Sequence, residues 1–163
     1  MTNATETTQT VQVYRVYIKA SAQAIWDAIT KPEWTEKYGY RGRVEFDLRP
    51  GGAFRTIADE GMQAAGMPEV VVDGEVVEAD PPRRLVQTWR ARWNDEGFTR
   101  LTYDINEREH GVSSLTVTHE LDGAPQTAAM VGGQDEDKGA GGGWAEVLSD
   151  LKSLLETGKP LTN

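Results

Sequence analysis

Hydrophobic and polar residues alternate along most of the chain between residues 42 and 121, which is the pattern of strands with one buried face. Short stretches rich in turn-forming residues, such as "RPGG", "NDEG" and "HG", separate the alternating segments. The pattern predicts about six antiparallel strands joined by tight turns. The positions that we expect on the buried face are Val44, Phe46, Leu48, Phe54, Leu85, Gln87, Trp89, Ala91, Trp93, Leu101, Tyr103, Ile105, Leu115, Val117, His119 and Leu121.

The N-terminal part of the chain predicts a strand followed by two helices. Residues 11–20 alternate and are rich in β-branched and aromatic side chains, which favours a first strand. Ser21 is a good helix N-cap, and apolar residues then recur at helical spacing over residues 22–30. Pro32 fits the first turn of a second short helix. Residues 1–10 are polar, and we expect them to form a disordered tail.

The longest helical pattern lies near the C-terminal end and stops at Gly158. Its apolar stripe consists of Trp144, Val147, Leu148, Leu151, Leu154 and Leu155. Its other side, which we expect to be polar, carries Glu146, Ser149, Asp150 and Ser153. The apolar stripe needs a partner, and the buried face of the sheet is the only large one that the pattern offers.

This order of elements predicts an α+β fold of the helix-grip type. A curved antiparallel sheet of six to seven strands would wrap around the C-terminal helix, and residues 11–160 would form one domain. A strongly curved sheet cannot contact a straight helix along its whole length, so we expect a cavity between them. The glycine-rich stretch Gly139–Gly143 carries little to restrain its backbone, and we hypothesise that it gates this cavity together with a loop at 59–69.

Composition and charge exclude several classes of function. The formal net charge of −9 disfavours binding to nucleic acids or anionic membranes, both of which need clustered positive charge. The chain has no cysteine, so it has neither disulfides nor thiolate metal sites. The acidic run 135–137 lacks the spacing of a calcium loop, so we predict no metal site, and no cofactor motif occurs. Without an apolar stretch long enough to span a membrane, a cytoplasmic protein is the expectation.

Four stretches, in this order, resemble the START-like (SRPBCC) superfamily, whose fold is called the helix grip. Within it, the chain is most similar to the family named after the activator of the ninety-kilodalton heat-shock chaperone's ATPase. The stretches are "IWDAITKPEWTEKYG", "FDLRPGGAFR", "GEVVEADPPRRLVQTW" and "GGGWAEVLSDLKSLLETG".

The resemblance implies a cup for a small molecule, without an agreed catalytic motif. Some relatives are polyketide cyclases, and one branch consists of co-chaperones, which would connect the family to the stress response. That branch has a further N-terminal domain, for which this chain has no room, so the resemblance favours the small-molecule role.

The candidate site combines aromatic and aliphatic walls with three polar side chains, Gln87, Tyr103 and His119, predicted on the same face. His119 is either a ligand contact, an acid–base group or a core histidine whose hydrogen bonds are satisfied inside the protein. Gln87 must be paired, hydrated or available to a ligand, because an unpaired buried amide is unfavourable. The predicted ligand-binding residues are Trp26, Phe46, Leu48, Phe54, Gln87, Trp89, Leu101, Tyr103, Val117, His119, Trp144 and Leu148.

Three functional hypotheses follow from these residues. The first is a non-catalytic carrier or sensor of a lipophilic or aromatic small molecule. The second is an enzyme of the cyclase or hydrolase type, with His119 and Tyr103 as catalytic candidates. The third is a module that binds a chaperone through a basic patch of Arg84, Arg90 and Arg92 on the outer face of the sheet. The sequence also leaves a homodimer open.

Overall fold

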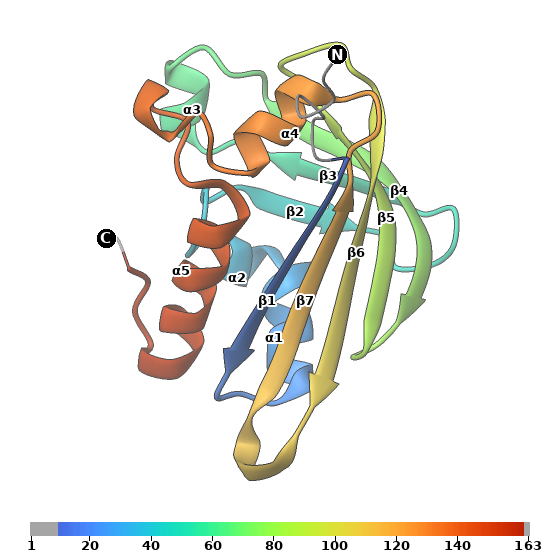
Figure 1. Cartoon of the computed structure of the whole chain (residues 1–163), viewed down its shortest axis with the longest axis vertical. Coiled ribbons are helices and arrows are strands. Elements are labelled where there is room, and N and C mark those ends of the chain that lie inside the picture. The colour runs from blue at the N-terminus through green and yellow to red at the C-terminus, as the bar shows by residue number, and fades with distance from the viewer. Residues whose placement is uncertain (1–9, 162–163) are drawn as a thin grey trace, which may run out of the picture.

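A seven-stranded antiparallel sheet dominates the computed structural model, which describes residues 10–161 (Figure 1). This sheet confirms the predicted fold class. The predicted disordered tail over residues 1–10 lies, apart from Thr10, outside the described residues. In the order in which they lie side by side, the strands are β1 (Val11–Ile18), β7 (Ser113–Glu120), β6 (Phe98–Glu107), β5 (Arg84–Ala91), β4 (Val70–Asp80), β3 (Ala53–Ile57) and β2 (Arg43–Phe46).

The helices include the two predicted after the first strand and the long one at the C-terminal end. The α-helices are α1 (Ala22–Thr30), α2 (Pro32–Thr35), α3 (Glu60–Ala64), α4 (Pro125–Val131) and α5 (Gly143–Thr157), and the short 3₁₀ helices are η2 (Glu109–Gly111) and η3 (Glu136–Lys138). Helix α3 falls within the stretch that we expected to be a loop. Its N-cap is Asp59, whose carboxylate accepts a hydrogen bond from the Met62 N–H at 2.8 Å.

The predicted alternation of faces is confirmed along the central strands. Four consecutive strands align Gln12, His119, Leu101 and Gln87 in one row across the sheet, and all four side chains are buried. Neighbouring side chains in such a row point to the same face of the sheet. The inward residues that we predicted strand by strand therefore lie together on one face.

The main core fills one end of the concave face, where α1 and α5 pack against the strands at the β1 side of the sheet (Figure 1). Helix α5 contributes Leu148, Leu151 and Leu154, and helix α1 contributes Ile25 and Trp26. The opposite end of the concave face, formed by β2, β3 and β4, carries a second apolar cluster, which consists of Val44, Phe54, Ala58, Val71 and Val72. The sheet is therefore divided into an end packed against the two helices and an end that faces the loops.

The prediction that one side of α5 is polar was wrong for Asp150, which is buried. Its Oδ2 accepts a hydrogen bond from the Gly39 N–H at 2.8 Å, and its Oδ1 accepts one from the Leu161 N–H at 2.6 Å. Both bonds are to backbone donors, and together they compensate for the loss of hydration that burial imposes on a carboxylate. Asp150 thus ties α5 to the loop between α2 and β2.

Candidate functional site

A pocket of about 550 Å³ opens at the β2–β4 end of the concave face. Residues of the sheet, of the α2–β2 loop, of α3 and of the chain from α4 to α5 line it. Figure 1 shows α3 at the same corner of the molecule as η3 and the chain that leads into α5. The volume lies within the range of about 300–1,000 Å³ that is typical of small-molecule sites.

The structure brings five of the predicted site residues together in the wall of this pocket, namely Phe46, Phe54, Trp89, Tyr103 and Trp144. Phe46 and Phe54 are stacked, with ring centroids 4.7 Å apart. Tyr103 and Trp144 meet edge to face at 6.1 Å. These separations are typical of aromatic pairs that fix one another's orientation, so the wall is a well-defined surface.

The other predicted residues lie outside the pocket lining. Trp26, Leu101, Val117 and Leu148 belong to the main core, where the helices cover the sheet. Leu48 follows β2 in a turn and is 38% exposed. Strand alternation identifies the face that a residue points to, but it does not say whether a helix or a pocket lies opposite.

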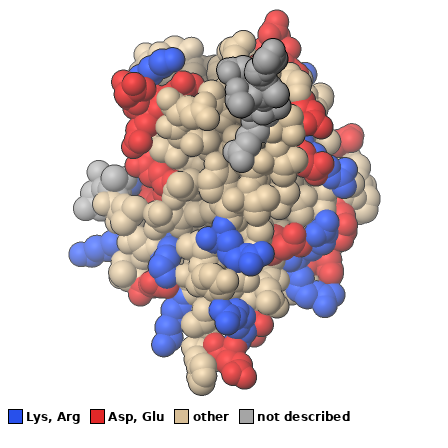
Figure 2. Space-filling view, viewed as in Figure 1, with Lys and Arg blue, Asp and Glu red and all other residues tan. Residues whose placement is uncertain are grey.

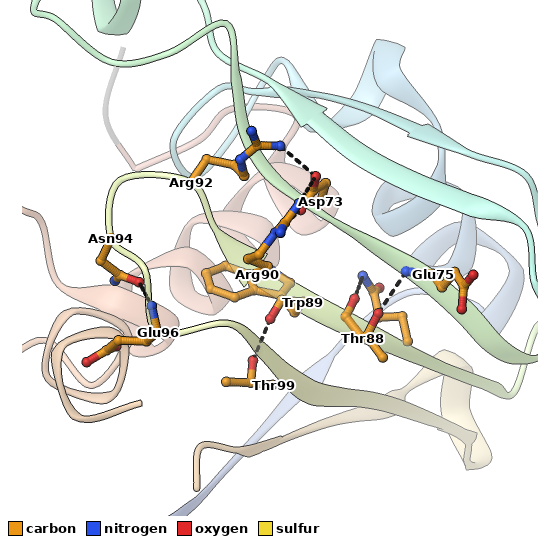
Figure 3. Close-up of polar contacts among 10 residues, drawn as sticks. Asp73, Glu75, Thr88, Trp89, Arg90, Arg92, Asn94, Glu96 and Thr99 are labelled. Atoms are coloured by element: carbon orange, nitrogen blue, oxygen red, sulfur yellow. Dashed lines mark hydrogen bonds and ion pairs between the residues drawn. The ribbon is translucent and has the colours of Figure 1, made fainter. Parts of the chain in front are cut away.

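His119 is fully buried beside the pocket, and both of its ring nitrogens have hydrogen-bond partners. The Trp144 indole N–H donates to Nδ1 at 3.1 Å, and an indole can only donate, so Nδ1 carries no proton. Nε2 therefore donates to the Thr99 hydroxyl at 2.8 Å. This hydroxyl in turn donates to the Trp89 carbonyl at 2.8 Å, and Figure 3 shows this second bond. The chain of bonds connects Trp144 on α5 with Trp89 on β5.

Burial lowers the pKa of His119 to about 3, because desolvation disfavours the charged imidazolium. The ring is therefore neutral at physiological pH, with one donating and one accepting nitrogen. In this state it holds the two tryptophans that line the pocket on either side of it, Trp89 and Trp144, in fixed positions.

Gln87 is buried in the same row of the sheet as His119, with Leu101 between them, and its position leaves one polar atom unsatisfied. Its Oε1 is the one buried side-chain oxygen or nitrogen in residues 10–161 that has no hydrogen-bond partner. Its Nε2 lies 3.4 Å from the Thr88 carbonyl oxygen, which is a weak bond. Gln87 is absent from the pocket lining, so the alternation correctly predicted its inward direction, whereas a contact with a ligand stays a prediction.

Of the three predicted polar residues, Tyr103 is the one that lines the pocket, and it carries a phenolic hydroxyl. No residue in the described part of the chain forms a hydrogen bond with it. Burial raises the pKa of Tyr103, so the phenol keeps its proton and can donate it to an oxygen or nitrogen acceptor.

Sequence reasoning missed the α2–β2 loop, where a tight turn from Tyr38 to Arg41 borders the pocket. The Arg41 N–H donates to the Tyr38 carbonyl at 3.0 Å and closes the turn. Three further bonds hold the turn in place: the Tyr38 hydroxyl donates to the Ala28 carbonyl, the Gly39 N–H donates to Asp150, and the Tyr40 hydroxyl donates to the Ala140 carbonyl, each at 2.8 Å. The turn is thus fixed to α1, to α5 and to the segment before α5.

Arg41 is the one charged residue among the described residues that line the pocket. Nothing in the local pattern distinguishes it from Arg43 two positions later, so its place became visible only in the folded chain. Met62 and Met67 also line the pocket and were missed. A signal for them was present, because methionine side chains in a glycine-rich loop are typical of adaptable binding surfaces.

The glycine-rich segment before α5 packs closely against its neighbours. Gly139, Gly141 and Gly143 have positive φ values of 86°, 77° and 69°, which side-chain-bearing residues rarely adopt. A Cβ on Gly141 would lie 2.9 Å from the Tyr40 hydroxyl oxygen, and a Cβ on Gly143 would lie 2.8 Å from the Gly133 nitrogen. These glycines allow the close approach of chain segments, while the predicted gate stays a hypothesis.

The outer face of the sheet does not form the free basic patch that the sequence suggested. Arg90 and Arg92 both bind Asp73, at 2.9 and 2.8 Å, as Figure 3 shows, and Arg84 binds Asp104 at 2.6 Å. The hydrogen bond from Arg90, followed by that from Arg92, lowers the pKa of Asp73 and keeps it ionised. These three arginines are therefore paired with carboxylates.

Figure 2 shows a broad uncharged area over the upper and central part of this face, acidic side chains mainly along its upper left and right edges, and Lys and Arg side chains mainly across its lower half. Within residues 10–161, no group of histidine and acidic side chains is arranged to hold a metal ion. No helix in the same range is both long and apolar enough to cross a bilayer.

Comparisons with solved structures show the same fold at low sequence identity. Protein MLL2253 from Mesorhizobium loti is 21% identical with a TM-score of 0.66, and the match covers 89% of this chain and 96% of that chain. The Aha1 dimer from Colwellia psychrerythraea is 19% identical with a TM-score of 0.65, over 91% of this chain and 98% of that chain. PFC0360w, an HSP90 activator from Plasmodium falciparum, is 20% identical with a TM-score of 0.54, over 68% and 72%.

No curated protein matches the chain, so the family assignment rests on a family model. The model described as "Activator of Hsp90 ATPase homolog 1-like protein" matches residues 19–156, which is most of the chain. This match confirms the resemblance seen in the sequence, and the solved structures confirm the fold. The chain therefore belongs to the family of activator of Hsp90 ATPase homolog 1-like proteins.

Proposed function

We propose that this protein binds a lipophilic small molecule in the pocket between the sheet and α5, as a non-catalytic carrier or sensor. The observation that carries the proposal is the lining: three tryptophans, two phenylalanines and several aliphatic side chains surround a space of about 550 Å³. The Tyr103 hydroxyl, with no partner in the described chain, would orient a polar group of the ligand. The cytoplasm remains the predicted location.

Binding is better supported than catalysis by His119. A general acid or base must reach the reacting group of the substrate, and both nitrogens of His119 are already bonded to Thr99 and Trp144. The ring is also absent from the pocket lining. The cyclase-like or hydrolytic alternative would therefore need Trp144 to move before His119 could contact a substrate.

The chaperone-binding alternative and the homodimer have support of a different kind. The family's description refers to Hsp90 activation, one structural relative is an HSP90 activator, and another is a dimer. Within the described residues, the arginines that we had expected to contact a chaperone are paired with acidic side chains. We therefore place both alternatives below small-molecule binding.

A pocket-filling substitution tests the proposal. Val72→Phe places a ring into the pocket, since Val72 is buried on β4 and lines it. The probe is 2-naphthylacetamide, which is neutral and aromatic. At about 100 times its dissociation constant it should raise the Tm of the wild-type protein by roughly 5–11 °C. In Val72→Phe we expect most of this ligand-induced shift to disappear, because the ring occupies the ligand's volume.

The matched control is Val77→Phe, on the same strand but at a position that is 40% exposed and does not line the pocket. Each variant is compared with its own unliganded Tm, so a general loss of stability does not affect the result. Val77→Phe should retain the full shift. An equal shift in both variants, or none in the wild type at millimolar probe, would contradict binding in this pocket.

A further inference from the structure

We propose that a groove on the outer face of the sheet binds a small phosphate monoester, of the kind represented by sugar phosphates and nucleoside monophosphates. The groove has a volume of about 680 Å³ and shares no lining residue with the pocket on the concave face. It is therefore a second site, and the inference does not depend on the proposed function.

The groove exists because short outward side chains lie between long ones. One row across the sheet pairs Arg15 on β1 with Thr116 on β7, and Thr116 with Asp104 on β6. The next row pairs Tyr17 on β1 with Ser114 on β7. Side chains in such a row point to the same face, so the two short residues of β7 form a floor between the longer side chains on both sides.

Two arginines on the β1 side of the groove have no carboxylate partner. Arg15 donates through Nε to the Thr116 hydroxyl at 2.9 Å, and the Arg108 guanidinium lies 5.1 Å from the centroid of the Tyr17 ring. Neither arginine forms an ion pair with any residue of 10–161. Arg15 and Tyr17 are two positions apart on one strand, so they lie on the same face about 7 Å apart. Both guanidiniums are therefore on the same side of the groove.

The two aspartates that also line the groove do not cancel this charge. Asp80 is paired with Arg83 at 2.9 Å, and Asp104 is paired with Arg84 at 2.6 Å. The lining contains four arginines and two aspartates, which leaves a formal charge of +2 in a protein whose net charge is −9. Figure 2 shows Lys and Arg side chains across the lower half of the face on which Figure 1 draws β1 and β7. An anion is therefore attracted to the β1 side of the groove.

The available donors favour a phosphate monoester over a carboxylate. A phosphate monoester carries a charge of about −1.5 to −2 at pH 7 and has three acceptor oxygens, whereas a carboxylate carries one charge and two oxygens. The two guanidiniums supply the matching charge and planar pairs of donors. The hydroxyls of Ser114 and Thr116 donate to no other described residue, so their protons are available to a further phosphate oxygen. The remaining volume of the groove accommodates the organic part of the ester.

Two series of probes test the inference: glucose, glucose 6-sulfate and glucose 6-phosphate, and adenosine with its 5′-sulfate and 5′-phosphate. Dissociation constants are measured at pH 7 and low ionic strength from amide chemical shifts in ¹H–¹⁵N NMR spectra. We expect the wild type to bind at least one phosphate ester with a dissociation constant below about 1 mM. The corresponding sulfate ester has the same shape and a single charge, and it should bind at least about threefold more weakly. Arg15→Gln and Arg108→Gln should each weaken binding of the phosphate ester roughly tenfold.

Arg100→Gln is the matched control, because Arg100 is an exposed arginine on β6 that does not line the groove. It removes the same charge from the protein and should bind the phosphate ester as tightly as the wild type does. The inference is wrong if neither phosphate ester binds below about 1 mM, or if sulfate and phosphate esters bind within threefold of each other. It is equally wrong if Arg15→Gln and Arg100→Gln have the same effect.

Discussion

Replacing Gly143 by alanine should destabilise the protein by about 4 kcal/mol or more, which is an exceptionally large effect for a single methyl group. The added Cβ would lie 2.6 Å from the carbonyl carbon of Val131 and 2.8 Å from the nitrogen of Gly133. Both are backbone atoms, so the clash cannot be relieved by the rotation of a side chain. Either α5 or the end of α4 must move, and each of them carries part of the pocket wall.

Gly139→Ala separates this steric effect from the effect of backbone conformation. Gly139 also has a positive φ, but a Cβ there would meet nothing within 4 Å. Its replacement should therefore show the conformational penalty alone, about 1–2 kcal/mol. For a protein of this size, the Tm should fall by roughly 2–8 °C for Gly139→Ala and by at least 8 °C for Gly143→Ala. Equal losses in thermal unfolding would show that the segment before α5 is not packed as described.

The second large effect is a loss of stability in mild acid that is caused by His119. The unfolded chain binds a proton at His119 with a pKa of about 6.5. In the folded protein, burial lowers the pKa of His119 to about 3. Above pH 6.5 both states are neutral there, and below it only the unfolded state is protonated, so the free energy of unfolding decreases as the pH falls. From pH 7 to pH 5 the decrease should be about 2 kcal/mol.

Urea unfolding at pH 7 and pH 5 measures this difference. Carboxylates with ordinary pKa values titrate mainly below pH 5, so they contribute little in this window. His119→Gln removes the titrating ring and keeps a donor for Thr99. The difference in its free energy of unfolding between pH 7 and pH 5 should be much smaller than in the wild type, even if the variant is less stable at both pH values. His110→Gln, at the exposed histidine of η2, should leave the pH dependence intact. An unchanged pH dependence in His119→Gln would refute the assignment of a neutral, buried His119.

The fold and the aromatic wall of the pocket could be predicted because they depend on local patterns. Alternation along β5 and β6 placed Trp89 and Tyr103 on the concave face, and helical spacing placed Trp144 on the face of α5 that meets it. Asp150 could also have been recognised. It lies three residues after Val147 and four before Leu154, so it borders the apolar stripe of the helix.

The position of Arg41 and the depth of His119 could not be predicted, because both depend on segments that are far apart in the sequence. The Arg41 turn is placed by Ala28, Ala140 and Asp150. His119 was correctly assigned to the inward face, but the Trp144 side chain on α5 packs against it. The alternation of residues along a strand predicts which face a side chain points to and does not predict which other element covers it. Sequence patterns identify faces, whereas a binding site is formed where several faces meet.

The central claim is that the pocket between the sheet and α5 is a binding site for a small molecule. A crystal structure of the protein grown with 2-naphthylacetamide tests it most directly. We expect electron density for the ring system between Trp89 and Trp144, with the amide of the probe within hydrogen-bond distance of the Tyr103 hydroxyl. An empty pocket at saturating ligand, or a pocket closed by collapse of α5 onto β2–β4, would contradict it.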